Sequence, residues 1–165
     1  SDLDSSELVT LPKSGISFTA GGTTSRRSNR TPGGLTEEVV RWKESEALRR
    51  YELSVFTVPD LRSASRSTIA QLGTRLKSST KPNGRHLLGD TKTEEGVLTS
   101  KDYSVMSSTT GSEQGQQIAF VTIAWIDGIH CIRISVVWKS PDNEGAPLEN
   151  AKEAVIDLSK SIQIK

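Results

Sequence analysis

The feature that most constrains the fold lies between residues 118 and 138. Two apolar runs rich in β-branched residues are joined there by the dipeptide Asp127-Gly128. An Asp-Gly dipeptide favours a type I′ turn, because both central positions of that two-residue hairpin turn need positive φ. A turn centred on this dipeptide predicts the cross-strand pairs Ile126–Ile129, Ile123–Ile132, Val121–Ile134 and Ala119–Val136. The opposite face carries the predicted pairs Thr122–Arg133 and Phe120–Ser135. Because the pairs from Ile123 outward share one apolar face, we expect an antiparallel sheet that is covered on one side.

Alternation of apolar and polar residues predicts further strands. These predicted strands cover Ile16–Ala20, Glu38–Glu44 and Tyr51–Val58, with a weaker strand pair near residues 96–108. Apolar spacings of three and four residues predict two helices. The first begins at the serines of residues 63–65 and carries Ile69, Leu72 and Leu76 on one face. The second begins at Pro147 and carries Leu148, Ala151, Val155, Leu158 and Ile162 on one face.

Stretches rich in glycine, proline and hydroxyl residues predict loops. Residues 21–34 hold four glycines, one proline and three arginines without any apolar residue, so a mobile surface loop is expected there. Further loops are predicted over residues 78–86, 107–117 and 139–147. The paired glycines of the first loop do not predict a nucleotide site, because no Gly-Lys-Ser/Thr follows them and a predicted strand stands where a phosphate-binding helix would begin.

The predicted element order is a run of strands, a helix, a strand pair, the long hairpin and a terminal helix. Runs of strands with single helices between them favour an α+β fold, with a single antiparallel sheet and helices packed on it. That order, the helix after the third strand, and a closing segment that ends in Ser161-Ile162-Gln163-Ile164 resemble the PsbP-like superfamily. The superfamily includes extrinsic subunits of photosystem II, a Ran-binding nuclear import factor, and bacterial periplasmic and lipoprotein domains.

The resemblance implies an α/β/α sandwich of PsbP-like type over residues 8–165, behind a polar N-terminal lead of residues 1–7. It rests on element order and on the C-terminal pattern. The aromatic, proline-rich opening that is common in the superfamily is only approximated by residues 11–18. The resemblance therefore implies an accessory, protein-binding role and assigns no functional residue.

Length and charge limit the classes of function. A chain of 165 residues fits one domain. Its 21 Lys and Arg against 20 Asp and Glu give a formal net charge of +1, which argues against a general nucleic-acid binder. The charge is uneven, because residues 1–85 hold 14 basic and 9 acidic residues, whereas residues 86–165 hold 7 and 11. This asymmetry either marks a binding surface or cancels within one folded sheet.

Cysteine usage and hydropathy bear on the compartment. With Cys131 as the single cysteine, an internal disulfide is impossible, so the chain does not need an oxidising compartment. No run of 18 apolar residues is present, so we predict a soluble protein without an integral membrane segment. Serine and threonine make up 39 of the 165 residues and the chain opens at Ser1, which favours an exported or organelle-processed protein.

The residues that commonly carry catalysis are sparse and poorly spaced. His130 and Cys131 are neighbours in a predicted strand, so their side chains point to opposite faces and cannot form a nucleophile–base pair. No Gly-x-Ser-x-Gly elbow is present, and two histidines with one cysteine offer no close-spaced ligands, so neither a metal nor a cofactor is predicted. We expect that the protein is not an enzyme. The alternative is a hydrolase whose residues come from several loops, such as His86, Asp90, Asp102 and Glu113.

Arg26, Arg27 and Arg30 are the candidate partner-binding residues. Guanidinium groups on a mobile loop can hold phosphate, sulfate or an acidic partner through paired hydrogen bonds. The opposing interpretation is a solvated loop whose charges serve solubility. Because no catalytic constellation is present, we expect a non-enzymatic binding or assembly module that docks to another protein.

The tryptophans raise an alternative function, a small-molecule or lipid carrier. Trp42 and Trp138 lie in predicted strands, and Trp125 lies close to the predicted hairpin turn. An indole near the edge of a sheet can line a cleft between sheet and helix. Trp125 and Trp138 are therefore the candidate ligand-cleft residues, and the competing interpretation places all three indoles in the core.

Overall fold

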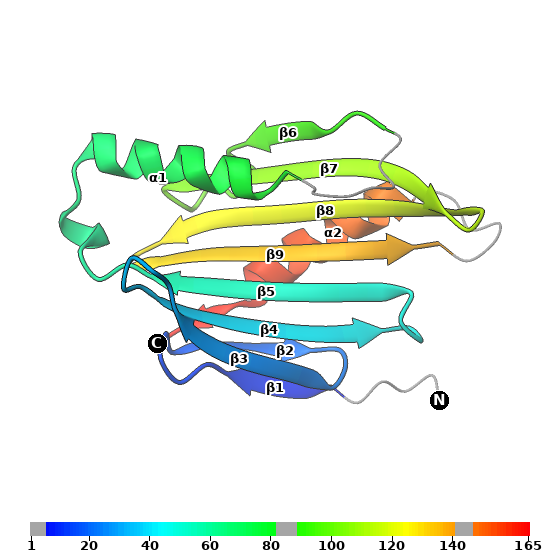
Figure 1. Cartoon of the computed structure of the whole chain (residues 1–165), viewed down its shortest axis with the longest axis horizontal. Helices are drawn as coiled ribbons and strands as arrows, with labels where there is room; N and C mark the ends of the chain where they lie inside the picture. Colours follow the sequence, from blue (N-terminus) through cyan, green and yellow to red (C-terminus); the bar gives the residue numbers. More distant parts are fainter. Residues whose placement is uncertain (1–5, 82–88, 141–146) are drawn as a thin grey trace.

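The computed structural model of the chain describes residues 6–81, 89–140 and 147–165. In chain order its elements are β1 (Glu7–Thr10), β2 (Ile16–Ala20), β3 (Thr24–Arg30), β4 (Thr36–Glu44), β5 (Arg49–Thr57), the 3₁₀ turn η1 (Leu61–Ser63), α1 (Arg66–Ser79), β6 (Lys92–Glu95), β7 (Tyr103–Glu113), β8 (Gln116–Asp127), β9 (His130–Lys139), α2 (Pro147–Ser161) and β10 (Gln163–Ile164). A large antiparallel sheet has the strand order β3-β4-β5-β9-β8-β7-β6, and a small sheet has the order β1-β2-β10 (Figure 1).

The predicted α+β class is confirmed, whereas the prediction of a single sheet is wrong. The small sheet forms because β1 and β10 both pair with β2, one on each side. It packs with α2 on one face of the large sheet, which we call the inner face. α1 packs on the opposite face, the outer face (Figure 1). The layers are therefore those of an α/β/α sandwich, with a small sheet added beside α2.

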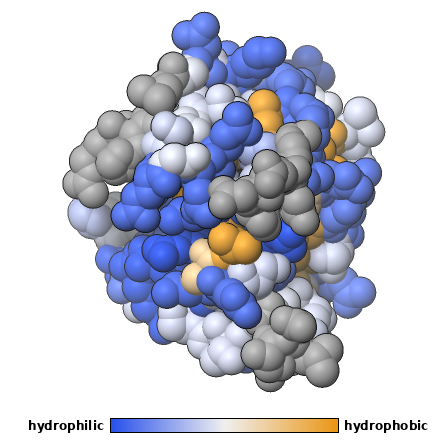
Figure 2. All heavy atoms as spheres, turned by 90° about the vertical axis from the view of Figure 1, so that its right-hand side faces the viewer, coloured by the Kyte–Doolittle hydropathy of each residue, from blue (hydrophilic) through white to orange (hydrophobic). Residues whose placement is uncertain are grey.

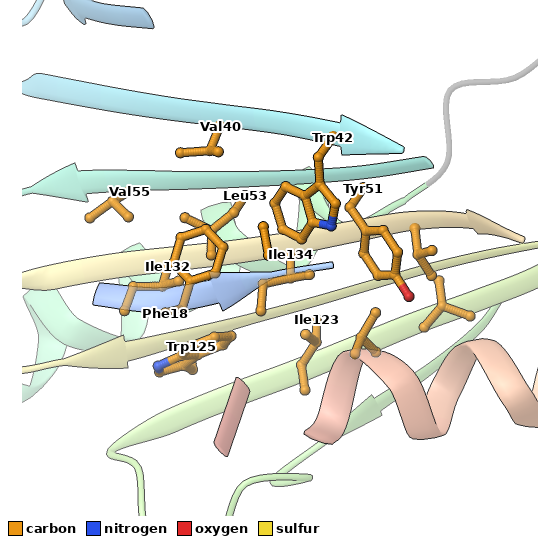
Figure 3. Packing of buried hydrophobic residues seen from close by; sticks show 14 of the residues in the cluster. Phe18, Val40, Trp42, Tyr51, Leu53, Val55, Ile123, Trp125, Ile132 and Ile134 are labelled. Atoms are coloured by element: carbon orange, nitrogen blue, oxygen red, sulfur yellow. The ribbon is translucent and has the colours of Figure 1, made fainter. Parts of the chain in front are cut away.

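The main core lies between the inner face and the elements that cover it. Figure 3 shows inward side chains of β4, β5, β8 and β9 gathered in one layer, together with Phe18 from β2. Trp42 and Tyr51 are directly opposed on β4 and β5, and their rings stack with centroids 5.1 Å apart. Phe18 packs against Trp42 at 5.4 Å. Alternation along the strands therefore buries a continuous aromatic and aliphatic layer.

The predicted β8–β9 hairpin is present, but its register differs by two residues from the prediction. The turn is centred on Gly128-Ile129, and Asp127 pairs with His130. On the apolar face the observed pairs are Trp125–Ile132, Ile123–Ile134, Val121–Val136 and Ala119–Trp138. On the opposite face they include Thr122–Ser135 and Phe120–Val137. The predicted apolar face is retained, because a slip of two residues returns every side chain to the same side of the sheet.

The geometry of the turn explains this register. Gly128 has a φ of 61°, whereas the φ of Ile129 is not positive. A type II′ turn needs positive φ at its first central position alone, so glycine there can be followed by an ordinary residue. The predicted type I′ turn would have placed Asp127 at positive φ. Asp127 instead remains in β8, where its carboxylate accepts a hydrogen bond from Lys101 Nζ at 2.7 Å.

Residues 24–30 form β3 rather than part of the mobile loop predicted over residues 21–34. β3 is an edge strand of the large sheet and pairs with β4 along its whole length. Almost all of its side chains are exposed, so the strand needs no apolar residues and gives no periodic signal. Its arginines suit this position, since charged side chains on an edge strand oppose pairing with another chain.

β7 and β8 extend through most of the loop predicted over residues 107–117. Hydroxyl groups on the outer face bond to one another there, with Ser107 Oγ 2.7 Å from Thr80 Oγ1 and 3.1 Å from Thr93 Oγ1. These polar pairs replace the apolar contacts on which the strand prediction relied. Of the weaker strand pair predicted near residues 96–108, only the strand that became β7 lies in that range, because β6 ends at Glu95.

The remaining predicted loops, residues 78–86 and 139–147, are tested only at their ends. α1 continues to Ser79 and β9 to Lys139, while α2 begins at Pro147. Residues 82–88 and 141–146 lie outside the described part of the chain.

Both predicted helices are confirmed. α1 begins after Ser65, whose Oγ accepts a hydrogen bond from the Thr68 N–H at 3.2 Å. Its apolar side packs on the outer face, whereas α2 packs on the inner face with Ala151 and Val155 fully buried. Within the described ranges, no helix combines the length and the hydropathy needed to span a membrane.

Candidate functional site

The outer face of the large sheet is only partly covered. α1 packs mainly over β7 and β8, and α2 lies behind the sheet in the view of Figure 1. The described residues place no helix over the middle of β4 and β5 on this side. The outward side chains of these strands, apart from the buried Val39 and Ser54, are therefore open to a partner.

Basic side chains gather on this open area. Directly opposed residues of antiparallel strands point to the same face, so the pairing registers place the outward side chains in cross-strand rows. The rows are Lys43–Arg50–Val137–Phe120, Ser25–Arg41–Glu52–Ser135 and Arg27–Val39–Ser54–Arg133. We call Arg27, Arg41, Lys43, Arg50 and Arg133 the basic surface.

Positive charge on the basic surface is only partly neutralised. Glu52 holds two of its arginines, with Oε2 accepting from Arg41 Nε at 2.6 Å and Oε1 lying 3.6 Å from Arg133 Nη2. Lys43 and Arg50 form no ion pair with any described residue. They are also directly opposed across β4 and β5, and like charges in that position destabilise a sheet. An anionic partner would relieve this repulsion.

A hollow of about 700 Å³ lies where β4 and β5 approach their connecting turn, beside the start of β3. Its lining consists of Arg41, Lys43 and Arg50, the aromatic residues Trp42 and Tyr51, and residues 22–25. Gly22 allows a close approach of two chain segments there, because a Cβ at this position would lie 2.2 Å from the carbonyl oxygen of Lys43. Figure 2 shows that the end of the molecule where β4 meets β5 is mostly hydrophilic, with hydrophobic residues in small groups. We call the hollow of about 700 Å³ the basic hollow.

An apolar groove of about 260 Å³ opens at the other end of the outer face, between α1 and the sheet. Its lining is Leu35, Phe56, Val58, Leu72, Arg75, Leu76, Ser79, Cys131 and Arg133. Phe56, Val58 and Leu72 are only half-buried, so apolar carbon remains open to solvent. Phe56 lies six positions after Arg50 in β5, and an extended strand spans roughly 20 Å over that distance. The apolar groove and the basic hollow therefore lie on one continuous surface.

Two arginines border the apolar groove. Arg133 Nη1 donates a hydrogen bond to the carbonyl oxygen of Ser79 at 3.5 Å, which ties the sheet to the end of α1. Arg75 lies on α1 and is exposed. Cys131 is 3% exposed, and burial raises the pKa of its thiol to about 11. Because such a thiol stays protonated at neutral pH, the groove offers apolar contact and positive charge rather than thiol chemistry.

The structure separates the three arginines that the sequence placed together. Arg26 and Arg30 project on the inner side of β3, and Arg27 projects on the outer face. Arg26 Nη2 donates to Glu7 Oε1 of β1 at 2.8 Å, and Arg30 Nη1 donates to the Gly34 carbonyl at 3.2 Å. Arg27 is therefore part of the basic surface, whereas Arg26 joins two strands.

Trp125 and Trp138, the candidate ligand-cleft residues, both point into the core on the inner face. Trp125 is 1% exposed and is directly opposed to Ile132 (Figure 3). Trp138 is buried, with the Arg49 guanidinium 3.9 Å from the centre of its ring. Neither indole lines the basic hollow or the apolar groove. Both contribute instead to the packing of the main core.

The structure separates Asp102 from Glu113, two described residues of the hydrolase alternative. Asp102 immediately precedes β7 and Glu113 ends it, so roughly 36 Å of extended chain separates them. Asp90 is exposed, and Glu113 lies 3.6 Å from Lys139 Nζ. His86 lies outside the described residues. Among those that are described, no group of three or more His, Cys, Asp or Glu side chains is placed to hold a metal ion.

Most of the basic surface was missed by the sequence analysis. Arg41 and Lys43 flank the inward Trp42, so the alternation that predicted a buried tryptophan also places both cations on the other side of β4. The strand pattern therefore already contained the information that Arg41 and Lys43 share the outer face. The apolar groove had no comparable signal, because it depends on where α1 lies across the sheet.

Comparison with known proteins concerns the fold. No family model matches the sequence, and no curated protein matches it significantly. Among solved structures, the cyanobacterial PsbP (CyanoP) from Synechocystis sp. PCC 6803 is similar, with a TM-score of 0.50 and 9% sequence identity. The similarity covers 98% of this chain and 93% of that chain. The chain therefore has a PsbP-like fold, as the element order predicted.

Proposed function

We propose that this chain is a non-enzymatic binding module that docks to an acidic segment of a partner protein through its outer face. The observation that carries the proposal is the apolar groove with Arg75 and Arg133 in its lining. A PsbP-like fold is consistent with an accessory role of this general kind.

The apolar groove has the dimensions of a pocket for one anchoring side chain. A volume of about 260 Å³ accommodates a leucine, methionine or phenylalanine side chain between Phe56 and Leu72. Full burial of such a side chain is worth roughly 1.5–3 kcal/mol. Single large side chains in desolvated pockets commonly dominate the binding energy of protein interfaces.

The positive charge beside the groove determines which residues of the partner segment flank its anchoring side chain. Arg75 is exposed beside the groove and forms no ion pair with any described residue. Carboxylates on the partner gain charge-assisted hydrogen bonds from such arginines and are attracted by the remaining basic surface. An extended segment of six or seven residues covers the roughly 20 Å between the groove and the basic hollow. The expected partner segment has one large apolar residue flanked by Asp or Glu.

The carrier alternative has less support. Pockets for small organic ligands commonly measure about 300–1,000 Å³ and are mostly apolar. The apolar groove is smaller than this range. The basic hollow lies within it, but its aromatic lining residues, Trp42 and Tyr51, are buried, whereas its cations Arg41, Lys43 and Arg50 are exposed. An apolar ligand would leave those cations unused. Docking of an acidic protein segment uses both the groove and the basic surface.

Selection from a displayed library of random twelve-residue peptides tests the proposal without a known partner. We expect the wild-type protein to enrich peptides with a large apolar residue flanked by Asp or Glu. The best peptide is then titrated by fluorescence anisotropy at low ionic strength. Arg75→Glu is expected to weaken its binding by about tenfold or more, because the new carboxylate repels those of the peptide. Leu72→Ala is expected to weaken binding by removing part of the groove wall.

Arg66→Glu is the matched control, because Arg66 is an exposed arginine of the same helix that does not line the groove. It changes the net charge by the same amount as Arg75→Glu. Equal losses of affinity in the two variants would reduce the effect to non-specific attraction and would contradict the proposal. Enrichment of peptides without an apolar–acidic pattern would contradict it as well.

A further inference from the structure

A polar cleft of about 460 Å³ lies at the end of the large sheet where β5 ends and β9 begins. Its walls come from the β1–β2 turn, η1, the β8–β9 turn and the segment around β10. It shares no lining residue with the apolar groove or the basic hollow. The cleft is therefore a site separate from the proposed docking surface.

Cationic side chains from distant parts of the sequence meet at this cleft. Lys13 belongs to the β1–β2 turn, Arg62 to η1, and Lys165 follows β10. In the part of the chain that the structure describes, none of the three forms an ion pair. All three side chains are exposed, so water screens much of their mutual repulsion, but together they give the cleft a positive local potential. Their convergence would be stabilised by a bound anion.

The carboxylates near the cleft already have other partners. Asp127 Oδ2 accepts a hydrogen bond from Lys101 Nζ at 2.7 Å. Glu38 is 2% exposed and accepts two backbone hydrogen bonds, from the Ser14 N–H at 2.8 Å and from the Lys13 N–H at 3.1 Å. Glu38 thus fixes the turn that carries Lys13. Of the two carboxylates only Asp127 lines the cleft, and the three cationic side chains of the lining remain for an anion.

His130 adds a titratable group to the wall of the cleft. It is 6% exposed, and its Nδ1 lies 3.4 Å from Thr57 Oγ1. Burial is the main cause that lowers the pKa of His130; Arg62 lowers it further, while Asp127 and Glu38 raise it. An anion bound nearby would favour the charged imidazolium and raise this pKa. His130 therefore reports whether the cleft is occupied.

We propose that this cleft binds a phosphate-type oxyanion between Lys13, Arg62 and Lys165. The planar guanidinium of Arg62 can donate two parallel hydrogen bonds to phosphate oxygens, and the lysines add point charges. The volume of about 460 Å³ exceeds that of one oxyanion. Free phosphate and the phosphate group of a small monoester therefore both fit the cleft.

Titration with inorganic phosphate at low ionic strength, followed by NMR signals of His130 and Gly128, tests this site. We expect saturable shifts of both signals and a higher pKa of His130 in the bound state. Arg62→Gln and Lys13→Gln are each expected to weaken phosphate affinity by about tenfold, because each removes a charge-assisted contact. Glycerol phosphate is titrated in parallel. Tighter binding of the ester supports an ester as the ligand, and equal affinity supports the free anion.

Arg66→Gln is the matched control, since this exposed arginine lies outside the cleft. It is expected to bind phosphate with the affinity of the wild type. Equal affinity of Arg62→Gln and the wild type would overturn the proposal. Shifts that grow without saturation, or that sodium chloride produces to the same extent, would also overturn it.

Discussion

At the scale of single residues, burial sets the chemistry of two neighbours at the start of β9. Alternation along the strand places Cys131 in the lining of the apolar groove and His130 in the lining of the polar cleft. Burial disfavours the charged form in both cases, so it raises the pKa of the thiol and lowers the pKa of the imidazole. The two residues therefore serve different surfaces and do not act on each other.

The lowered pKa of His130 makes stability depend on pH. Below the ordinary pKa of 6.5 the unfolded chain binds a proton that the folded His130 still excludes. We therefore expect the free energy of unfolding to fall as the pH falls below 6.5, until the folded His130 is protonated as well. Urea denaturation between pH 7.5 and 5 measures this slope. In His130→Gln the slope over that window should be smaller, and an unchanged slope would contradict the assignment.

The face of the sheet to which a side chain points could be predicted from the sequence for strands that have one buried face. The inward Trp42 follows from alternation, and the outward Arg41 and Lys43 follow from the same pattern. The positions of Arg26 and Arg27 could not be predicted in this way, because β3 has no buried face from which to count. Assigning these arginines to a loop made them one cluster, whereas the strand places them on opposite sides.

At the scale of elements, the turn between β4 and β5 is under backbone strain. Ser45, Glu46 and Ala47 all have positive φ, at 52°, 56° and 67°. This left-handed conformation costs a residue with a Cβ roughly 1–2 kcal/mol. The three residues nevertheless hold the register in which Trp42 stacks on Tyr51.

Glu46→Gly is expected to stabilise the protein by about 0.5–1 kcal/mol. Glycine adopts positive φ without the steric cost, and its greater freedom in the unfolded chain cancels part of that gain. Thermal or urea denaturation measures the change. Glu46→Ala is the control, because it removes the carboxylate and keeps the Cβ, so it should give no such gain. Equal stabilisation by both substitutions would assign the effect to charge rather than to strain.

Elements with a buried face were predicted well, and those without one were not. β2, β4, β5, β8, β9 and both helices follow from apolar periodicity. β3 and the second half of β7 lack this signal, because β3 is an exposed edge and β7 uses hydroxyl pairs there. β1 begins at Glu7, within the lead predicted over residues 1–7, and β10 is too short for a periodic signal. Local turn chemistry located the β8–β9 turn but misplaced its centre by one residue, since Gly128 suits more than one turn type.

At the scale of the whole molecule, the uneven charge of the sequence becomes a property of one surface. Arg27, Arg41, Lys43, Arg50 and Arg75 all belong to residues 1–85, where basic residues outnumber acidic ones. β3, β4, β5 and α1 place these side chains on the same side of the large sheet. The sequence showed the asymmetry. The tertiary arrangement adds that these five cations lie on one side of the sheet, where Glu52 partly neutralises them.

Photocrosslinking in the native cells tests the central claim, docking through the outer face, most directly. A photoreactive residue replaces Ser79, an exposed residue of the apolar groove, and in a matched variant replaces Glu153, an exposed residue of α2 on the other side of the sheet. The account predicts a discrete protein adduct from position 79 that is lost in combination with Arg75→Glu, and none from position 153. It also predicts that the crosslinked segment of the partner contains a large apolar residue flanked by carboxylates. No adduct from position 79, or the same adduct from both positions, would contradict docking through the outer face.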